Sequence, residues 1–121
     1  MNSAVSGRQP EVAAEVIATL AEIAESTQSW PVMAAKYGVE NPLPPWKTSL
    51  DGMCDALDAG DFGFQDRRDE EDVLSATRYR QLPFPESQLV ALAHSLIARG
   101  VIGEAELAQR LAAVRARLEA G

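Results

Sequence analysis

Hydrophobic residues recur at three- and four-residue steps along most of this 121-residue chain, the spacing of one face of an α-helix. Two such stretches, residues 45–59 and 85–99, begin near prolines and end at Gly60 and Gly100, as helices commonly do. A polar and highly charged crossover separates the two stretches. The pattern therefore predicts a central pair of helices joined by this crossover, and no strand pattern accompanies them.

The N-terminal third, residues 1–43, is predicted to form a tail and a helical arm. A helix over residues 10–26 has glutamates on its polar face and an apolar stripe made of Val12, Val16, Ile17, Leu20 and Ile23. A short helix ends at Gly38, and the three prolines of residues 38–45 predict an extended linker. Residues 44–121 are predicted to form the main helical domain.

The last helix is predicted to begin at Glu104. Its apolar residues step by four, three and four positions, which is the seam of a short coiled coil: Leu107, Leu111, Val114 and Leu118. Between the central helices, the acids from Asp69 to Asp72 are predicted to form the solvated first turn of a short helix that ends at Tyr79. The fold class is therefore all-α, with about five helices.

Glycine within the first central helix predicts a close contact with a neighbouring backbone. Gly52 lies in the middle of that helix, where glycine costs about 1 kcal/mol relative to alanine. We expect the approach of another segment to explain its presence.

Composition and charge narrow the class of protein. The chain is 46% hydrophobic and 24% charged, which is typical of a soluble domain, and its formal charge of −7 disfavours nucleic-acid partners. It has no apolar run of about 18 residues that could span a membrane, and its first residues lack the apolar core of a signal peptide. A single cysteine fits a reducing cytoplasm and excludes an internal disulfide.

Few side chains suggest chemistry within this chain. Cys54 lies on an apolar helix face, where burial would raise its pKa and make it inert. His94 is the only histidine, so we expect a surface or capping role and no metal site. Tyr79 is expected in the core with its hydroxyl bonded at an edge. Arg67 and Arg68 either pair with the neighbouring acids at the surface or direct a guanidinium toward an anionic group on a partner.

The order of these features resembles a known enzyme family. A helix opened by Trp46, LPPWKTSLDGMCDALDAGDF, is followed by the arginine-bearing crossover, by LVALAHSLIARGVI and by GEAELAQRLAAVRARLE. This order is similar to the N-terminal helical half of the nitrile hydratase β subunit and to the small β chain of thiocyanate hydrolase. The resemblance covers roughly residues 40–121.

The resemblance implies a helical subunit that binds no metal itself. In that family, cobalt(III) or iron(III) is held by a Cys-x-x-Cys-Ser-Cys claw in another subunit, of the α type, and this sequence lacks that motif. The family's β chain contributes arginines that bond the oxidised cysteine oxygens of the claw. The first of these corresponds to Arg68, with Arg67 beside it, whereas the second falls near Val73, which is not basic. A tyrosine that borders the pocket in some members corresponds to Tyr79.

The family's β subunit continues into an SH3-like barrel, and no strand pattern is present here. We therefore expect either that the barrel is a separate polypeptide, as in thiocyanate hydrolase, or that this chain is a free-standing relative. The sequence thus predicts a cytoplasmic small subunit that clamps a metal-bearing subunit in a complex that hydrates a C≡N bond. Two alternatives remain open. The first is a metallochaperone or maturation factor with the same fold, and the second is a helical adaptor unrelated to nitriles.

Overall fold

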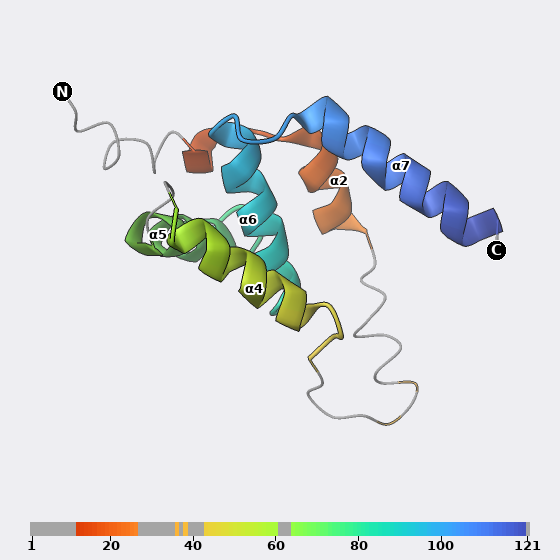
Figure 1. Cartoon of the computed structure of the whole chain (residues 1–121), viewed down its shortest axis with the longest axis horizontal. Coiled ribbons are helices and arrows are strands. Elements are labelled where there is room, and N and C mark those ends of the chain that lie inside the picture. The colour runs from red at the N-terminus through yellow and green to blue at the C-terminus, as the bar shows by residue number, and fades with distance from the viewer. Residues whose placement is uncertain (1–11, 27–35, 37, 39–42, 61–63, 121) are drawn as a thin grey trace.

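The computed structural model describes residues 12–26, 36, 38, 43–60 and 64–120, and the regular elements in that part of the chain are helices (Figure 1). The five longer helices are α2 (Ala18–Glu25), α4 (Lys47–Asp58), α5 (Phe64–Ala76), α6 (Glu86–Ala98) and α7 (Glu104–Ala120). The all-α prediction is confirmed, and the predicted central pair corresponds to α4 and α6. The short helix predicted before Gly38 lies mostly outside the described residues.

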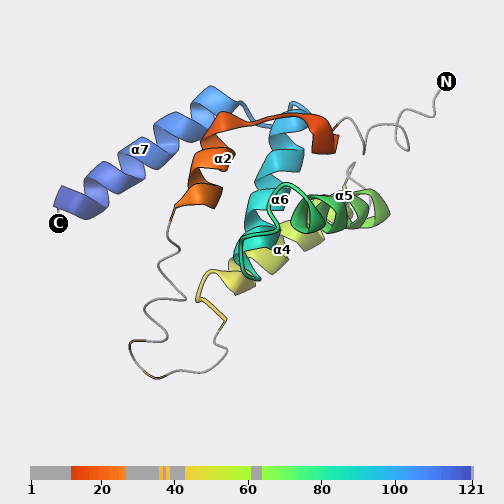
Figure 2. The same cartoon turned by 180° about the vertical axis from the view of Figure 1, so that it is seen from behind.

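Helix α6 crosses the middle of the structure, with α4 and α5 to its left and below it and α2 and α7 to its right (Figure 1). The same arrangement is seen from behind in Figure 2. Val90 and Ala91 of α6 belong to a core cluster with residues of α2 and of the segment after α5, whereas Leu92 and Leu96 belong to a second cluster with α4. Because α6 contributes to both clusters, it is buried on nearly every side, and its buried residues include polar ones such as His94 and Ser95.

The helix predicted over residues 10–26 is interrupted. Residues 12–14 form one helical turn, residues 15–17 leave the helix, and α2 begins at Ala18. Ile17 has an extended backbone and is fully buried, whereas Val16 of the predicted stripe is 70% exposed. The interruption therefore changes which residues of the predicted stripe reach the core.

Two distant side chains stabilise this interruption. In an uninterrupted helix, the carbonyl oxygens of residues 12–14 would accept hydrogen bonds from backbone N–H groups four residues later. Here Nε2 of His94 donates to the oxygen of Val12 at 2.6 Å. The guanidinium of Arg78 donates to the oxygens of Ala13 and Ala14, each at 3.1 Å. Side chains thus satisfy carbonyl groups that the local sequence would have satisfied by helix formation.

Helix α5 begins at Phe64, five residues before the predicted start at Asp69. The acids at 69–72 therefore lie within the helix, and the prediction that they form a solvated first turn is wrong. Two pairs spaced by four residues, Arg67–Glu71 and Arg68–Asp72, support the helix along this charged stretch. Glu70 lies in the same stretch of α5 and is buried.

The end of α6 is a Schellman motif, as the predicted stop at Gly100 requires. Gly100 has φ of +78°, and its N–H donates to the oxygen of Ile97 at 3.0 Å. The next N–H, of Val101, donates to the oxygen of Leu96 at 2.8 Å. The chain then turns sharply and enters α7.

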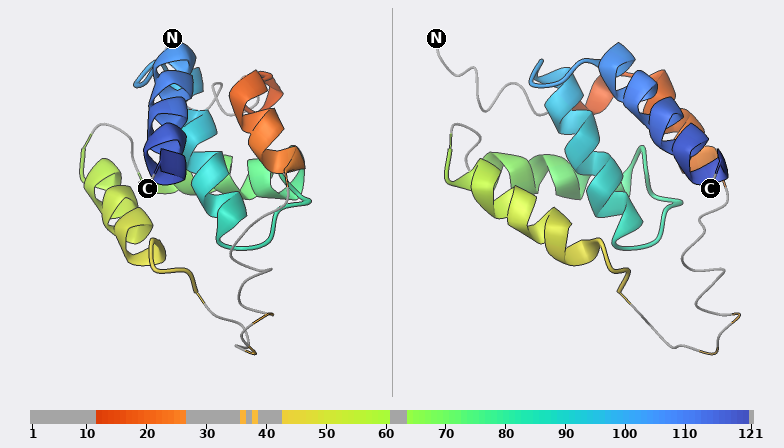
Figure 3. Two further views of the ribbon diagram at one scale, coloured as in Figure 1. Left: turned by 90° about the vertical axis from the view of Figure 1, so that its right-hand side faces the viewer. Right: turned by 45° about the vertical axis from the view of Figure 1, so that its right-hand side comes forward.

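Helix α7 is attached to the rest of the structure near its N-terminus. Oε2 of Glu104 accepts hydrogen bonds from N and Oγ1 of Thr19, at 3.1 and 3.2 Å, and so caps the first turn of α2. Leu107 packs against the first core cluster. The remaining turns of α7 extend beside α2 with no buried residue (Figure 3).

Gly52 has no close neighbour, so the predicted backbone approach is wrong. A Cβ placed on Gly52 meets no heavy atom within 4 Å outside its own helix, and the residue lies in the exposed middle of α4. We expect Gly52→Ala to raise the free energy of unfolding by about 1 kcal/mol, because alanine has the higher helix propensity. Urea unfolding measures this change. Gly100→Ala is the matched control with the opposite sign, since its positive φ strains alanine, and a neutral or destabilising Gly52→Ala would contradict this interpretation.

Candidate functional site

A hollow of about 280 Å³ lies between α4, α5 and the start of α6, and it contains both arginines that the sequence singled out. Three cationic and three anionic side chains line it: Lys47, Arg67, Arg68, Asp51, Asp55 and Glu71. Lys47 pairs with Asp51, which lowers the pKa of that carboxyl group, and its ammonium group lies 5.2 Å from the ring centre of Phe84. The charges of the hollow are therefore balanced.

Arg67 joins α5 to α4 from an almost buried position, 7% exposed. Nε and Nη2 donate to the two carboxylate oxygens of Asp58 at 2.6 and 3.0 Å, and Nη1 donates to Glu71 at 3.1 Å. The bidentate bond with Asp58 raises the pKa of Arg67, whereas burial raises the pKa of Glu71 despite the nearby cation. Arg67 thus forms a buried inter-helix ion pair.

Arg68 has a different environment, although it is the next residue. Successive residues of an α-helix point about 100° apart, so Arg68 cannot share the inward direction of Arg67. Its side chain is 54% exposed, and Nε lies 3.6 Å from Oδ1 of Asp72, which is also exposed. Such a surface pair contributes little to stability. Of the two arginines, Arg68 is the one whose guanidinium another molecule can reach.

Tyr79 and His94 form a buried hydrogen-bonded pair. The Tyr79 hydroxyl lies 2.7 Å from Nδ1 of His94, and the two rings meet edge to face. A carbonyl group can only accept, so Nε2 of His94 holds the proton that is donated to Val12, and Nδ1 accepts the hydroxyl proton of Tyr79. The predicted surface position of His94 is wrong, because the ring is 0% exposed. The capping alternative fits the structure, since Nε2 bonds the carbonyl of Val12 in the helical turn of residues 12–14.

Burial changes the acid–base properties of this pair. It lowers the pKa of His94 and raises the pKa of Tyr79 to about 12. The expected core position of Tyr79 is confirmed, but the expected edge position of its hydroxyl is wrong, because the hydroxyl bonds His94 in the interior. Tyr79 therefore does not line the hollow that contains Arg67 and Arg68.

Cys54 is buried beneath the same hollow, as the sequence predicts. Burial raises the pKa of its thiol, which disfavours the reactive thiolate. The amide nitrogen of Gln88 lies 3.9 Å from the sulfur atom. The position of Cys54 is that of a core residue and not of a nucleophile.

The sequence did not indicate the ion pair between Glu70 and Arg99. Glu70 is 1% exposed, and its two carboxylate oxygens accept from Nε and Nη2 of Arg99 at the end of α6. No local signal pairs these two residues, because 29 positions separate Glu70 from Arg99. The role of Arg78, which bonds Ala13 and Ala14, had no local signal because about 65 residues separate the partners.

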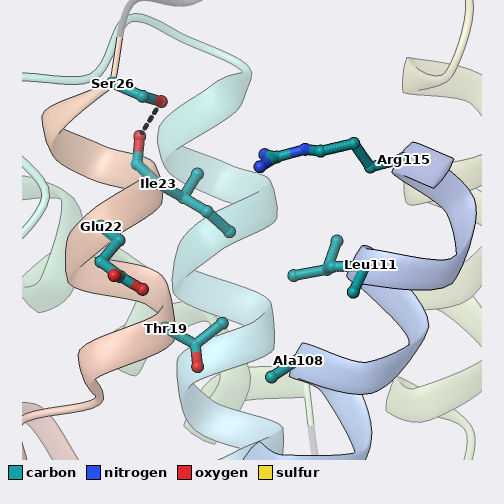
Figure 4. A pocket seen from close by; sticks show the side chains of 8 residues that line it. Thr19, Glu22, Ile23, Ser26, Ala108, Leu111 and Arg115 are labelled. Carbon is teal, nitrogen blue, oxygen red and sulfur yellow. Dashed lines mark hydrogen bonds between the residues drawn. The ribbon is translucent and has the colours of Figure 1, made fainter. Parts of the chain in front are cut away.

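A second hollow, of about 390 Å³, lies between α2 and α7. Ile23 of α2 and Leu111 of α7 point toward each other across it, and Arg115 extends over it from the next turn of α7 (Figure 4). An adjoining hollow, also lined by Ile23, Leu111 and Arg115, continues to Val114 and Leu118. The two hollows form one groove along the predicted seam of α7, called the α2–α7 groove below.

Comparison with protein-family models, with curated proteins and with solved structures found no match for this chain. Among the described residues, no helix is both long and apolar enough to cross a membrane. The same part of the chain contains no group of three or more histidine, cysteine or acidic side chains that could hold a metal ion.

Proposed function

We propose that this chain is a small, non-metal-binding subunit of a cytoplasmic nitrile hydratase- or thiocyanate hydrolase-type complex, which hydrates a C≡N bond. The metal, cobalt(III) or iron(III), belongs to the partner subunit in this proposal. The sequence resemblance over the two central helices and the crossover suggests it. The proposal treats the extended helical architecture as a clamp on the partner.

The exposure of Arg68 is the single observation that supports the proposal most. Arg67 is held by Asp58 and Glu71, whereas Arg68 is 54% exposed and lines the hollow between α4, α5 and α6 in a loose surface pair. A guanidinium offers two parallel N–H donors, which match the paired oxygens of oxidised cysteines. In the proposal, Arg68 bonds those oxygens on the partner, Arg67 positions α5 by anchoring it to α4, and the buried Tyr79 has no contact with the partner.

Substitution of Arg68 tests the proposal in the assembled complex. We expect Arg68→Ala, co-expressed with a claw-bearing subunit, to lower turnover at least tenfold while size-exclusion chromatography still shows the complex. Arg68→Lys should recover only part of the activity, because lysine keeps the charge and lacks the planar fork. Arg80→Ala, an exposed arginine in the turn after α5, is the control and should change neither property.

Two results would contradict the proposal. Unchanged turnover of the assembled Arg68→Ala complex would remove the role of the guanidinium. Failure of the wild-type chain to form a complex with a claw-bearing subunit would instead favour the adaptor alternative.

A further inference from the structure

The seam of α7 is apolar, regular and largely exposed. Leu111, Val114 and Leu118 are 41%, 40% and 73% exposed, although their spacing is that of residues which bury against another helix. Only the first seam residue, Leu107, packs against the core. All three line the α2–α7 groove, together with Glu119. Figure 4 shows Leu111 pointing across the groove toward Ile23 on the opposite wall, which also carries Glu22.

Arginines flank this seam at the positions that select a coiled-coil partner. With Leu107 and Val114 at d and Leu111 and Leu118 at a, the g positions are Arg110 and Arg117, and one e position is Arg115. All three arginines are exposed. Residues at e and g face the corresponding flanks of the partner helix, so their charge determines which partner is accepted.

This charge pattern disfavours pairing between two copies of the chain. In an antiparallel pair centred on the seam, Arg110 of one copy would face Arg117 of its partner. In a parallel pair, Arg110 would face Arg115. Both orientations bring like charges together along the apolar contact, and like charges across such a contact oppose association.

We propose that the α2–α7 groove binds an amphipathic helix of another protein whose apolar seam is flanked by aspartate or glutamate. The apolar side of that helix would cover the three exposed seam residues and Ile23, and its acids would pair with the flanking arginines. The inference rests on α7 and α2 alone and does not require that the chain belong to a nitrile hydratase-type complex.

Synthetic helices test this inference directly on the full chain. The probe is a peptide of three heptads with leucine at a and d and glutamate at e and g, whose like-charged flanks keep it monomeric. We expect micromolar binding by fluorescence anisotropy, at least tenfold tighter than that of the same peptide with lysine at e and g. Leu111→Glu and Leu118→Glu should each weaken binding at least tenfold, whereas Val101→Glu, an exposed apolar position outside the groove, should leave binding unchanged.

Exchange of the arginines for glutamates distinguishes binding that depends on charge from nonspecific hydrophobic binding. The variant R110E/R115E/R117E should prefer the lysine-flanked peptide, provided that its circular dichroism matches the wild type. The inference would be overturned if the full chain bound both peptides equally or bound neither. It would also be overturned if sedimentation equilibrium showed a stable dimer of the chain that Leu118→Glu dissociates.

Discussion

Replacing Arg99 by alanine is expected to lower the free energy of unfolding by about 3–5 kcal/mol, because it leaves a buried carboxylate without its cation. Glu70 lies within α5 with no exposed side-chain surface, and Arg99 donates to both of its carboxylate oxygens. Burying an ionised carboxylate without a partner is costly in a medium of low polarity. Urea unfolding of the variant, monitored by circular dichroism, measures this loss.

A double substitution distinguishes the unpaired charge from the simple loss of a bond. Glu70→Met combined with Arg99→Met should recover most of the stability, since an apolar pair of similar volume often replaces a buried ion pair at little cost. Arg80→Ala, an exposed arginine, should change stability by less than about 0.5 kcal/mol. A cost of under about 1 kcal/mol for Arg99→Ala would show that Glu70 does not depend on this partner.

His94→Ala is expected to destabilise the fold by about 2–4 kcal/mol. The substitution removes a buried ring and leaves the hydroxyl of Tyr79 without its partner, while the carbonyl of Val12 keeps only the 3.3 Å bond from the backbone N–H of Glu15. Because the bond to Val12 helps to hold residues 12–14 against α6, the N-terminal segment should lose protection first. Amide hydrogen exchange of α2 measures that local loss, and Tyr79→Phe, which keeps the ring and removes only one bond, should cost less.

The same histidine makes stability depend on pH near neutrality. Burial lowers the pKa of His94 below its usual 6.5, and the nearby charge of Arg78 lowers it further. The bond to Val12 and the charges of Glu15 and Glu70 oppose this shift but do not cancel it. The unfolded chain therefore binds a proton first as the pH falls. The contribution of neutral His94 is fully present above pH 6.5 and is lost between pH 6.5 and the lower pKa of the folded state.

Unfolding free energies at pH 7.5, 6.5 and 5.5 measure this dependence, and the slope cannot exceed about 1.4 kcal/mol per pH unit for one group. Since the chain has one histidine, His94→Ala should remove most of the slope in this range. If the slope persists unchanged in that variant, the pH dependence of stability comes from other titratable groups.

The helices α4, α6 and α7 were predictable from the sequence because their patterns are periodic and their ends are marked. Gly100 ends α6 by the predicted local geometry, and the start of α7 at Glu104 follows the glycine before it. These signals act within a few residues. The start of α5 was misplaced because an acidic run fits both a first turn and a helix interior whose acids pair with arginines one turn away.

The environment of the arginines was not predictable, since it depends on how helices distant in sequence meet. Arg67 and Arg68 are adjacent in the sequence and have the same acidic residues nearby, so the sequence alone does not distinguish them. The packing of α5 on α4 makes Asp58 the partner of Arg67. The break at residues 15–17 likewise depends on His94 and Arg78, more than 60 residues away. Local propensity favours a continuous helix there, and long-range hydrogen bonds outweigh it.

The subunit composition of the active enzyme tests the central proposal most directly. Purified complex should be assayed for hydration of nitriles and thiocyanate and then resolved by mass spectrometry under native conditions. We expect this 13.0 kDa chain in fixed stoichiometry with a claw-bearing subunit that contains cobalt or iron. Full activity in a preparation that lacks the chain would contradict the proposal and would favour a maturation factor that leaves before catalysis.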